Sequence, residues 1–171
     1  MRVLTITTPD IENGFGNRVT IWVAGCNRRC PGCHNPHTWK YDQGKELLSD
    51  EVLEKIMDEV GHDYIQGITL SGGDPFDQNE ESLKELLEFI TCFKVRYPDK
   101  DIWIYSGGLY EDFLKNDIIR EILIWSDVLV DGPFVQHLKK LDLPFRGSTN
   151  QRIIDLKKSI YSDKIVEIPV G

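Results

Sequence analysis

The chain has 171 residues and a net charge of -8 at pH 7, and 40% of its residues are hydrophobic. This length and composition predict a single soluble domain over 1–171 that buries its own core. A nucleic-acid partner is not expected, because such binding depends on basic residues that neutralise phosphates. The first residues lack the apolar stretch of a signal peptide and no apolar run is long enough to span a membrane, so we expect a cytoplasmic protein without a membrane partner.

Strand-like and helix-like segments alternate along the chain. Runs rich in β-branched and aromatic residues predict strands at 19–24, 67–71, 102–105 and 128–130, with weaker candidates at 152–154 and 164–168. Apolar residues at helical spacing predict helices at 50–60, 79–97 and 114–125. This alternation predicts an α/β fold with a parallel sheet. A closed barrel of eight βα units takes about 250 residues, so we expect a partial, open (β/α) barrel of about five to six units.

Segments rich in glycine or cysteine follow four of the predicted strands. They are residues 26–33, 71–75, 106–108 and 131–133. Because ligands of open α/β sheets bind at the carboxyl ends of the strands, we expect these segments to form one site.

Three of the four cysteines lie within eight residues, at Cys26, Cys30 and Cys33. In a reducing compartment, clustered cysteines are more often metal ligands than disulfides. A structural zinc ion needs four ligands, and here only one C-x2-C pair exists, with His34 or His37 to complete a site. We discount Cys92, because its helix position places it on the solvent-facing side. A non-catalytic zinc-binding module is one alternative.

The other interpretation follows from the number of ligands. A [4Fe–4S] cluster normally takes four cysteines, so three cysteines leave one iron open, and an open coordination position is typical of catalysis. The C-x3-C-x2-C loop after the first predicted strand resembles the signature of the radical S-adenosylmethionine superfamily. That resemblance implies an open barrel of the radical SAM type, whose open iron chelates S-adenosylmethionine. An electron from the cluster then cleaves the cofactor to a 5′-deoxyadenosyl radical.

The resemblance also implies cofactor-binding residues. Adenine would contact the backbone from Gly32 through Cys33 to His34. The turn of Gly72, Gly73 and Asp74 resembles the superfamily's motif for the methionine amino group, although alone it is an ordinary turn after a strand. Ser106 and Asp131 end the third and fourth predicted strands, where relatives contact the ribose and approach the cofactor.

Two further segments resemble a narrower family. Residues 13–18 resemble the (Asp/Asn)-Gly-Pro-Gly-x-Arg segment of glycyl-radical-enzyme activases, with Phe15 in place of proline and no strand expected before it. Residues 145–152 resemble the Arg-Gly-Ser-Ser-Asn-Gln segment of activators of the anaerobic ribonucleoside-triphosphate reductase. This resemblance covers nearly the whole chain, up to about Ser159.

The narrower resemblance implies an oxidoreductase that generates a glycyl radical on the large subunit of that reductase. Arg146, Asn150 and Gln151 would contact this partner, and a flavodoxin- or ferredoxin-like protein would donate the electron. Arg28 and Arg29, between the cysteines, either steer such an acidic donor or lie in a solvated loop. A carboxydeazaguanine synthase-like enzyme acting on a small molecule is the alternative within the superfamily.

Overall fold

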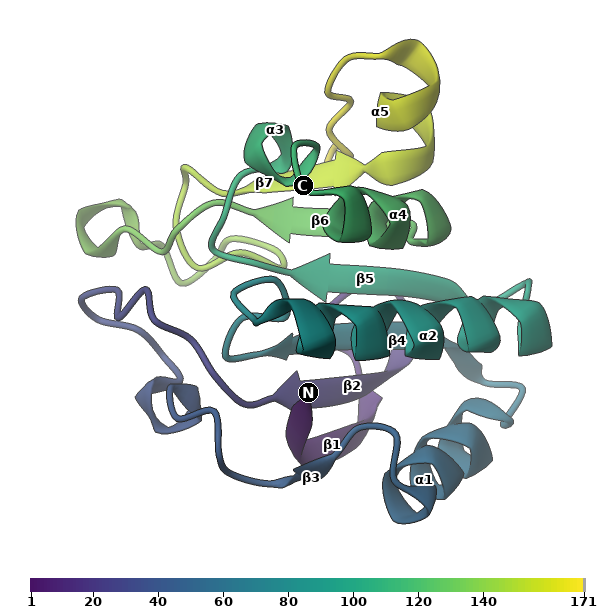
Figure 1. Cartoon of the computed structure of the whole chain (residues 1–171). Helices are drawn as coiled ribbons and strands as arrows, with labels where there is room; N and C mark the ends of the chain where they lie inside the picture. Colours follow the sequence, from purple (N-terminus) through teal and green to yellow (C-terminus); the bar gives the residue numbers. More distant parts are fainter. Residues whose placement is uncertain (171) are drawn as a thin grey trace.

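The computed structural model describes residues 1–170, which form a mixed α/β fold around one open seven-stranded sheet (Figure 1). The strands are β1 (Arg2–Asp10), β2 (Asn17–Val23), β3 (Lys45–Glu46), β4 (Ile65–Gly72), β5 (Asp101–Tyr105), β6 (Val128–Asp131) and β7 (Arg152–Asp155). Their order in the sheet is β3-β1-β2-β4-β5-β6-β7. Strands β2, β4, β5 and β6 are parallel, and their carboxyl ends lie together on the left in Figure 1. The expected open α/β sheet is therefore confirmed.

Five α-helices accompany the sheet. They are α1 (Asp50–Val60), α2 (Glu80–Arg96), α3 (Tyr110–Phe113), α4 (Asp117–Trp125) and α5 (Leu156–Ser162), with short 3-10 turns at Pro36–Thr38 and Gln136–Leu138. The side chains of Ser49, Asn79 and Asn116 accept hydrogen bonds from backbone N–H groups in the first turns of α1, α2 and α4, which explains where these helices begin. None of the helices described in residues 1–170 is long and apolar enough to cross a membrane.

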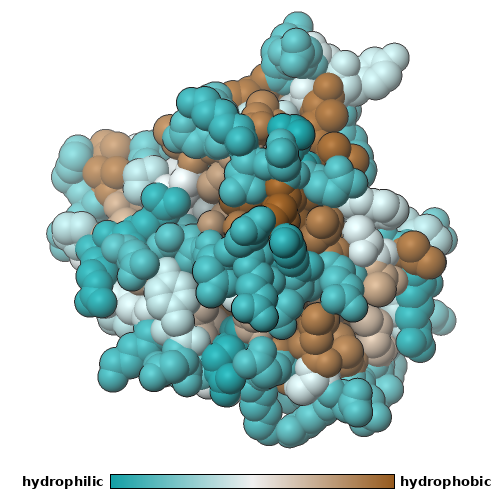
Figure 2. Space-filling model, in the orientation of Figure 1, coloured by the Kyte–Doolittle hydropathy of each residue, from teal (hydrophilic) through white to brown (hydrophobic). Residues whose placement is uncertain are grey.

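The two faces of the sheet have different coverings. Ile102 and Ile104 of β5 pack into the main core with apolar residues of α1, α2 and α4, whose outer side is mostly polar in Figure 2. The alternate residues Trp103 and Tyr105 face the other way, because side chains alternate across a strand. Loops rather than helices cover this second face, where Phe15 and Phe145 both lie against the Trp103 ring.

The edges of the sheet differ from the expectation. Strand β1 was not predicted, because its alternating threonines read as polar; it is a half-exposed strand antiparallel to β2, so a strand does precede residues 13–18. Strand β7 is antiparallel to β6. Residues 164–168 are no strand and contribute one isolated bridge, between Glu167 and Ile154. The expected helix over 114–125 starts only at Asp117, capped by Asn116.

Candidate functional site

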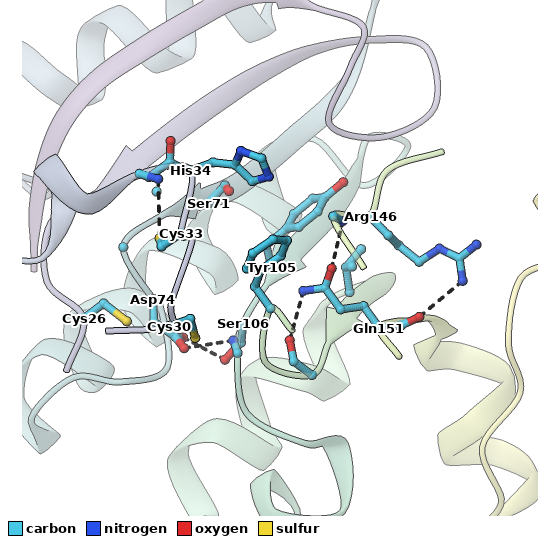
Figure 3. Close-up of a pocket in the computed structure, with 18 of the residues that line it drawn as sticks. Cys26, Cys30, Cys33, His34, Ser71, Asp74, Tyr105, Ser106, Arg146 and Gln151 are labelled. Carbon is cyan, nitrogen blue, oxygen red and sulfur yellow. Dashed lines mark hydrogen bonds between the residues drawn. The ribbon is translucent and has the colours of Figure 1, made fainter. Parts of the chain in front are cut away.

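A cavity of about 700 Å³ lies at the carboxyl ends of the parallel strands (Figure 3). It is lined by five sets of residues that are far apart in the sequence. They come from the loops after β1, β2, β4 and β5 and from the segment between β6 and β7, and they include Cys26, Cys30, Cys33, His34, Ser71, Gly72, Gly73, Asp74, Ser106, Arg146 and Gln151. The glycine- and cysteine-rich segments thus meet where the sheet topology predicts.

All three clustered cysteines face this cavity. The backbone of their loop is fixed at its start, because the N–H groups of Gly25 and Cys26 donate to the carbonyls of Thr38 and Trp39 at 2.7 and 3.1 Å. Burial raises the pKa of the Cys26 thiol and so favours its protonated form when no metal ion is bound. Within residues 1–170, no group of three or more Cys, His, Asp or Glu side chains is already gathered closely enough to hold a metal ion.

The donor set nevertheless fits an iron–sulfur cluster. Three thiols on one loop line one cavity, and thiolate is the ligand that such clusters use. A zinc site would need a fourth ligand, and the ring of His34 lies against Phe134, with the ring centres 5.2 Å apart. Cys92 is exposed on α2 and does not line the cavity, in agreement with its expected position.

Asp74 is the most highly connected polar group of the site. Its carboxylate is buried and accepts four hydrogen bonds, from the N–H of Phe76 (2.9 Å), the hydroxyl of Ser106 (2.7 Å), the N–H of Gly107 (2.9 Å) and Nε of Arg28 (2.9 Å). These donors come from the cysteine loop and from the ends of β4 and β5. Asp74 therefore joins three of the four loops that the sequence singled out, and Ser106 is one of the residues that hold its carboxylate.

The two glycines before Asp74 are required by the packing of the backbone. A Cβ at Gly73 would lie 2.4 Å from the carbonyl oxygen of Gly25, and one at Gly72 would lie 2.7 Å from that of Val23. Gly72 also has a φ of 106°, which side chains rarely adopt. The end of β4 can therefore lie directly against the residues that precede Cys26.

Asp131 does not line the cavity. Its fully buried carboxylate accepts hydrogen bonds from the backbone N–H of Tyr110 at 2.8 Å and from Arg152 at 2.9 and 2.5 Å. The same Arg152 guanidinium reaches Glu111 at 2.9 and 2.8 Å, and this hydrogen bonding lowers the pKa of Glu111 to about 2. These contacts tie α3 to β6 and β7 and argue for a structural role of Asp131, whose cofactor contact stays a prediction.

The segment that resembles the activator family folds into a loop held by its own polar groups. The side-chain oxygen of Gln151 accepts from the N–H of Gly147 at 2.8 Å, and its amide donates to the carbonyl of Gly132 at 3.0 Å. Asn150 donates to the carbonyl of Pro133 at 2.8 Å. Arg146 and Gln151 line the cavity and Asn150 does not, whereas Nε of Arg146 is buried without a hydrogen-bond partner.

Other residues of the cysteine loop are placed differently. His34 lines the cavity, and Gly32 does not. Gly32 has a φ of 77°, and a Cβ there would meet the side chain of Gln136 at 3.0 Å. Its contact with adenine stays a prediction, and the positive φ explains why a glycine occupies this position.

Sequence reasoning missed several lining residues. Tyr105 lines the cavity, and its signal was the alternation of aromatic residues with an apolar one in Trp103–Tyr105, whereas Ser71 lies in the segment 71–75 that the sequence placed at the site. Glu12 and Asn13 also line the cavity, and the buried Asp10 accepts from the backbone N–H of Glu12 and from the side-chain amide of Asn13, which holds this loop. These contacts span two and three residues, and an aspartate before a polar turn was their local signal.

Comparison with known proteins adds an independent observation. The family described as a 4Fe–4S single cluster domain matches residues 12–154. A protein of Haemophilus influenzae is 38% identical over 90% of this chain and 97% of its own length. A protein of Escherichia coli strain K12 is 36% identical over 86% of this chain and 94% of its own length, and one of Enterobacteria phage T4 is 38% identical over 84% and 87%. Each of these three relatives is named anaerobic ribonucleoside-triphosphate reductase-activating protein.

Proposed function

The chain belongs to the family of anaerobic ribonucleoside-triphosphate reductase-activating proteins, and we propose that it activates such a reductase by generating a glycyl radical on the reductase's large subunit. The observation that carries this proposal is the meeting of three thiols with the family-typical loops around one cavity. The match to a 4Fe–4S domain favours an iron–sulfur cluster over the zinc-binding alternative. In this proposal residues 1–171 are one domain of the radical SAM type, and the open sheet is a partial barrel.

The proposed chemistry depends on two groups that the cavity would hold. Cys26, Cys30 and Cys33 would hold a [4Fe–4S] cluster, which would supply one electron for the cleavage of S-adenosylmethionine into methionine and a 5′-deoxyadenosyl radical, and this radical would take a hydrogen atom from the partner's glycine. A cavity of about 700 Å³ has the volume of a typical small-molecule cofactor site. No side chain needs to act as a general acid or base, because the radical would do the chemistry, and the protein would supply binding, orientation and exclusion of water.

The residues of the chain contribute to binding in different ways. The backbone of Gly72 and Gly73 approaches the cysteine loop closely, so a cofactor held there would lie beside the thiols. Asp74 already accepts four hydrogen bonds, and we assign it the role of orienting the loops around the cavity. The predicted contact with the amino group of the cofactor's methionine part would be a further contact of the same carboxylate. Gly32, Cys33, His34, Ser106 and Asp131 are proposed as further cofactor residues on the resemblance alone.

The partner is proposed from the family. Arg146 and Gln151 line the cavity, so a peptide loop of the reductase that enters it would lie near these two residues. Asn150 holds the neighbouring turn and would act through it. The electron donor is proposed to be a flavodoxin- or ferredoxin-like protein.

An anaerobic assay tests the proposal. Reconstituted protein should contain iron and sulfide in near-equal amounts, and mixing it with reductant, S-adenosylmethionine and the reductase should give a glycyl-radical EPR signal. Serine replacement of any one of Cys26, Cys30 or Cys33 should remove the signal, whereas the matched control Cys92→Ser should retain it, because Cys92 is exposed on α2. Deoxyadenosine formation without a partner radical would point to an enzyme acting on a small molecule. Colourless protein that holds zinc would refute the proposal.

A further inference from the structure

Arg28 lies between the first two cysteines of the loop, and its side chain folds back over the sheet. Its Nε donates to Asp74 at 2.9 Å, and 34% of the side chain stays exposed. The neighbouring Arg29 behaves differently: its guanidinium lies over the ring of Trp39, 5.2 Å from the ring centre. The two arginines therefore make different contacts, and neither of the two alternatives from the sequence, donor steering or a solvated loop, predicts the contact of Arg28 with Asp74.

The end of β5 is shaped to receive the Arg28 side chain. A Cβ at Gly107 would lie 2.5 Å from Cδ of Arg28, and one at Gly108 would lie 2.9 Å from its Nη2. The N–H of Gly107 donates to the same carboxylate oxygen of Asp74 that receives Nε of Arg28. The loop, the glycine pair and the buried carboxylate thus form one contact that holds the segment between Cys26 and Cys30.

The charges around Cys26 give this contact a second consequence. The carboxylates of Asp74 and Asp77 both accept hydrogen bonds from residues 27 and 28 of the loop, and Arg28 is the cation paired with Asp74. Asp77 also accepts from the N–H of Asn27 at 2.7 Å, so it is fixed beside the loop. One-electron reduction adds a negative charge to a cluster, and a nearby fixed cation stabilises that charge.

We propose that Arg28 is a positioning residue for the iron–sulfur cluster: it clamps the cysteine loop to β4 and β5 through Asp74, and its positive charge makes the cluster easier to reduce. This inference rests on the proposed function for the presence of the cluster. It differs from donor steering, because steering changes the rate at which a protein donor delivers the electron and leaves the cluster's midpoint potential unchanged.

The test is a redox titration, followed by EPR, of the anaerobically reconstituted full chain. At the potential where the wild-type cluster is half reduced, Arg28→Gln should lower the reduced-to-oxidised ratio about tenfold, which is about 59 mV for a one-electron couple. Arg28→Lys keeps the charge and should lie closer to the wild type than Arg28→Gln does. Arg29→Gln removes the same charge one residue further on and should leave the ratio unchanged. Equal ratios for Arg28→Gln and Arg29→Gln would overturn the inference.

A second measurement decides the matter if Arg28→Gln loads no cluster. In the cluster-free full chain, the backbone N–H of Asn27, which donates to Asp77, should exchange with solvent deuterium about fivefold faster in Arg28→Gln than in Arg29→Gln, the factor that a modest, partly exposed ion pair supplies. Equal rates would overturn the clamp. Wild-type protein that takes up no iron would instead refute the proposed function, so the two failures are distinguishable.

Discussion

Replacing Arg152 with alanine should destabilise the fold through a single buried carboxylate. Arg152 gives Asp131 two of its three hydrogen bonds, and Asp131 is fully buried. After the replacement only the N–H of Tyr110 would remain on that carboxylate. Breaking a buried ion pair on one side costs about 3–5 kcal/mol. Because 24% of the Arg152 side chain is exposed, water can reach the carboxylate after truncation, and we expect a loss of about 2–3 kcal/mol.

Urea unfolding of the full chain at pH 7, followed by circular dichroism, measures this loss. The matched control is Arg120→Ala, whose partner Asp117 is 88% exposed, and it should cost less than about 0.5 kcal/mol. Adding Asp131→Asn to Arg152→Ala should recover about 1 kcal/mol, because a stranded amide is cheaper to bury than a stranded carboxylate. A loss no larger than that of Arg120→Ala, or no recovery in the double variant, would refute the structural role of Asp131.

Three further predictions concern other contacts. Glu111→Gln should lower the free energy of unfolding by about 0.5–1 kcal/mol at pH 7. Because the folded state lowers the pKa of Glu111 to about 2, this difference from the wild type, measured by urea unfolding, should be complete above about pH 4.5 and should shrink as the pH falls towards 2. Gly73→Ala places a Cβ 2.4 Å from the Gly25 carbonyl oxygen, so it should lower the iron content after reconstitution by at least about half, and full loading would contradict this packing. Asn116→Ala removes the side chain that caps α4 and should lower the free energy of unfolding by about 1 kcal/mol, with an unchanged value counting against the cap.

Local patterns predicted the centre of this fold well. The strands near 19–24, 67–71, 102–105 and 128–130 all exist, because central parallel strands are buried on both faces and consist of continuous apolar runs. The edges were harder. Strand β1 is half exposed and rich in threonine, and β7 offers only two buried isoleucines, so neither produced a strong local signal.

The sequence also predicted only part of the candidate site. That the loops after the strands meet at one cavity follows from the topology of a parallel sheet, which the sequence predicted. The partners of individual polar groups did not follow. Asp74 receives Arg28 from 46 positions away, and Asp131 receives Arg152 from 21 positions away. Such pairs depend on which side chains the folded backbone brings together, and a single sequence contains no local record of that.

The cysteines are an intermediate case, because their chemistry is local and their geometry is not. Spacing and residue type predict that the three cysteines are the ligands, and the start of their loop is fixed by hydrogen bonds from Gly25 and Cys26 to residues 38 and 39. Three thiolates repel one another and must lose their protons to bind iron, so their final arrangement is coupled to the metal itself. In our proposal, the contact of Arg28 with Asp74 restricts the loop before a cluster binds. The loop then loses less conformational entropy when it binds the cluster. The cysteine spacing therefore specifies what can bind, and contacts distant in sequence decide how readily the loop can bind it.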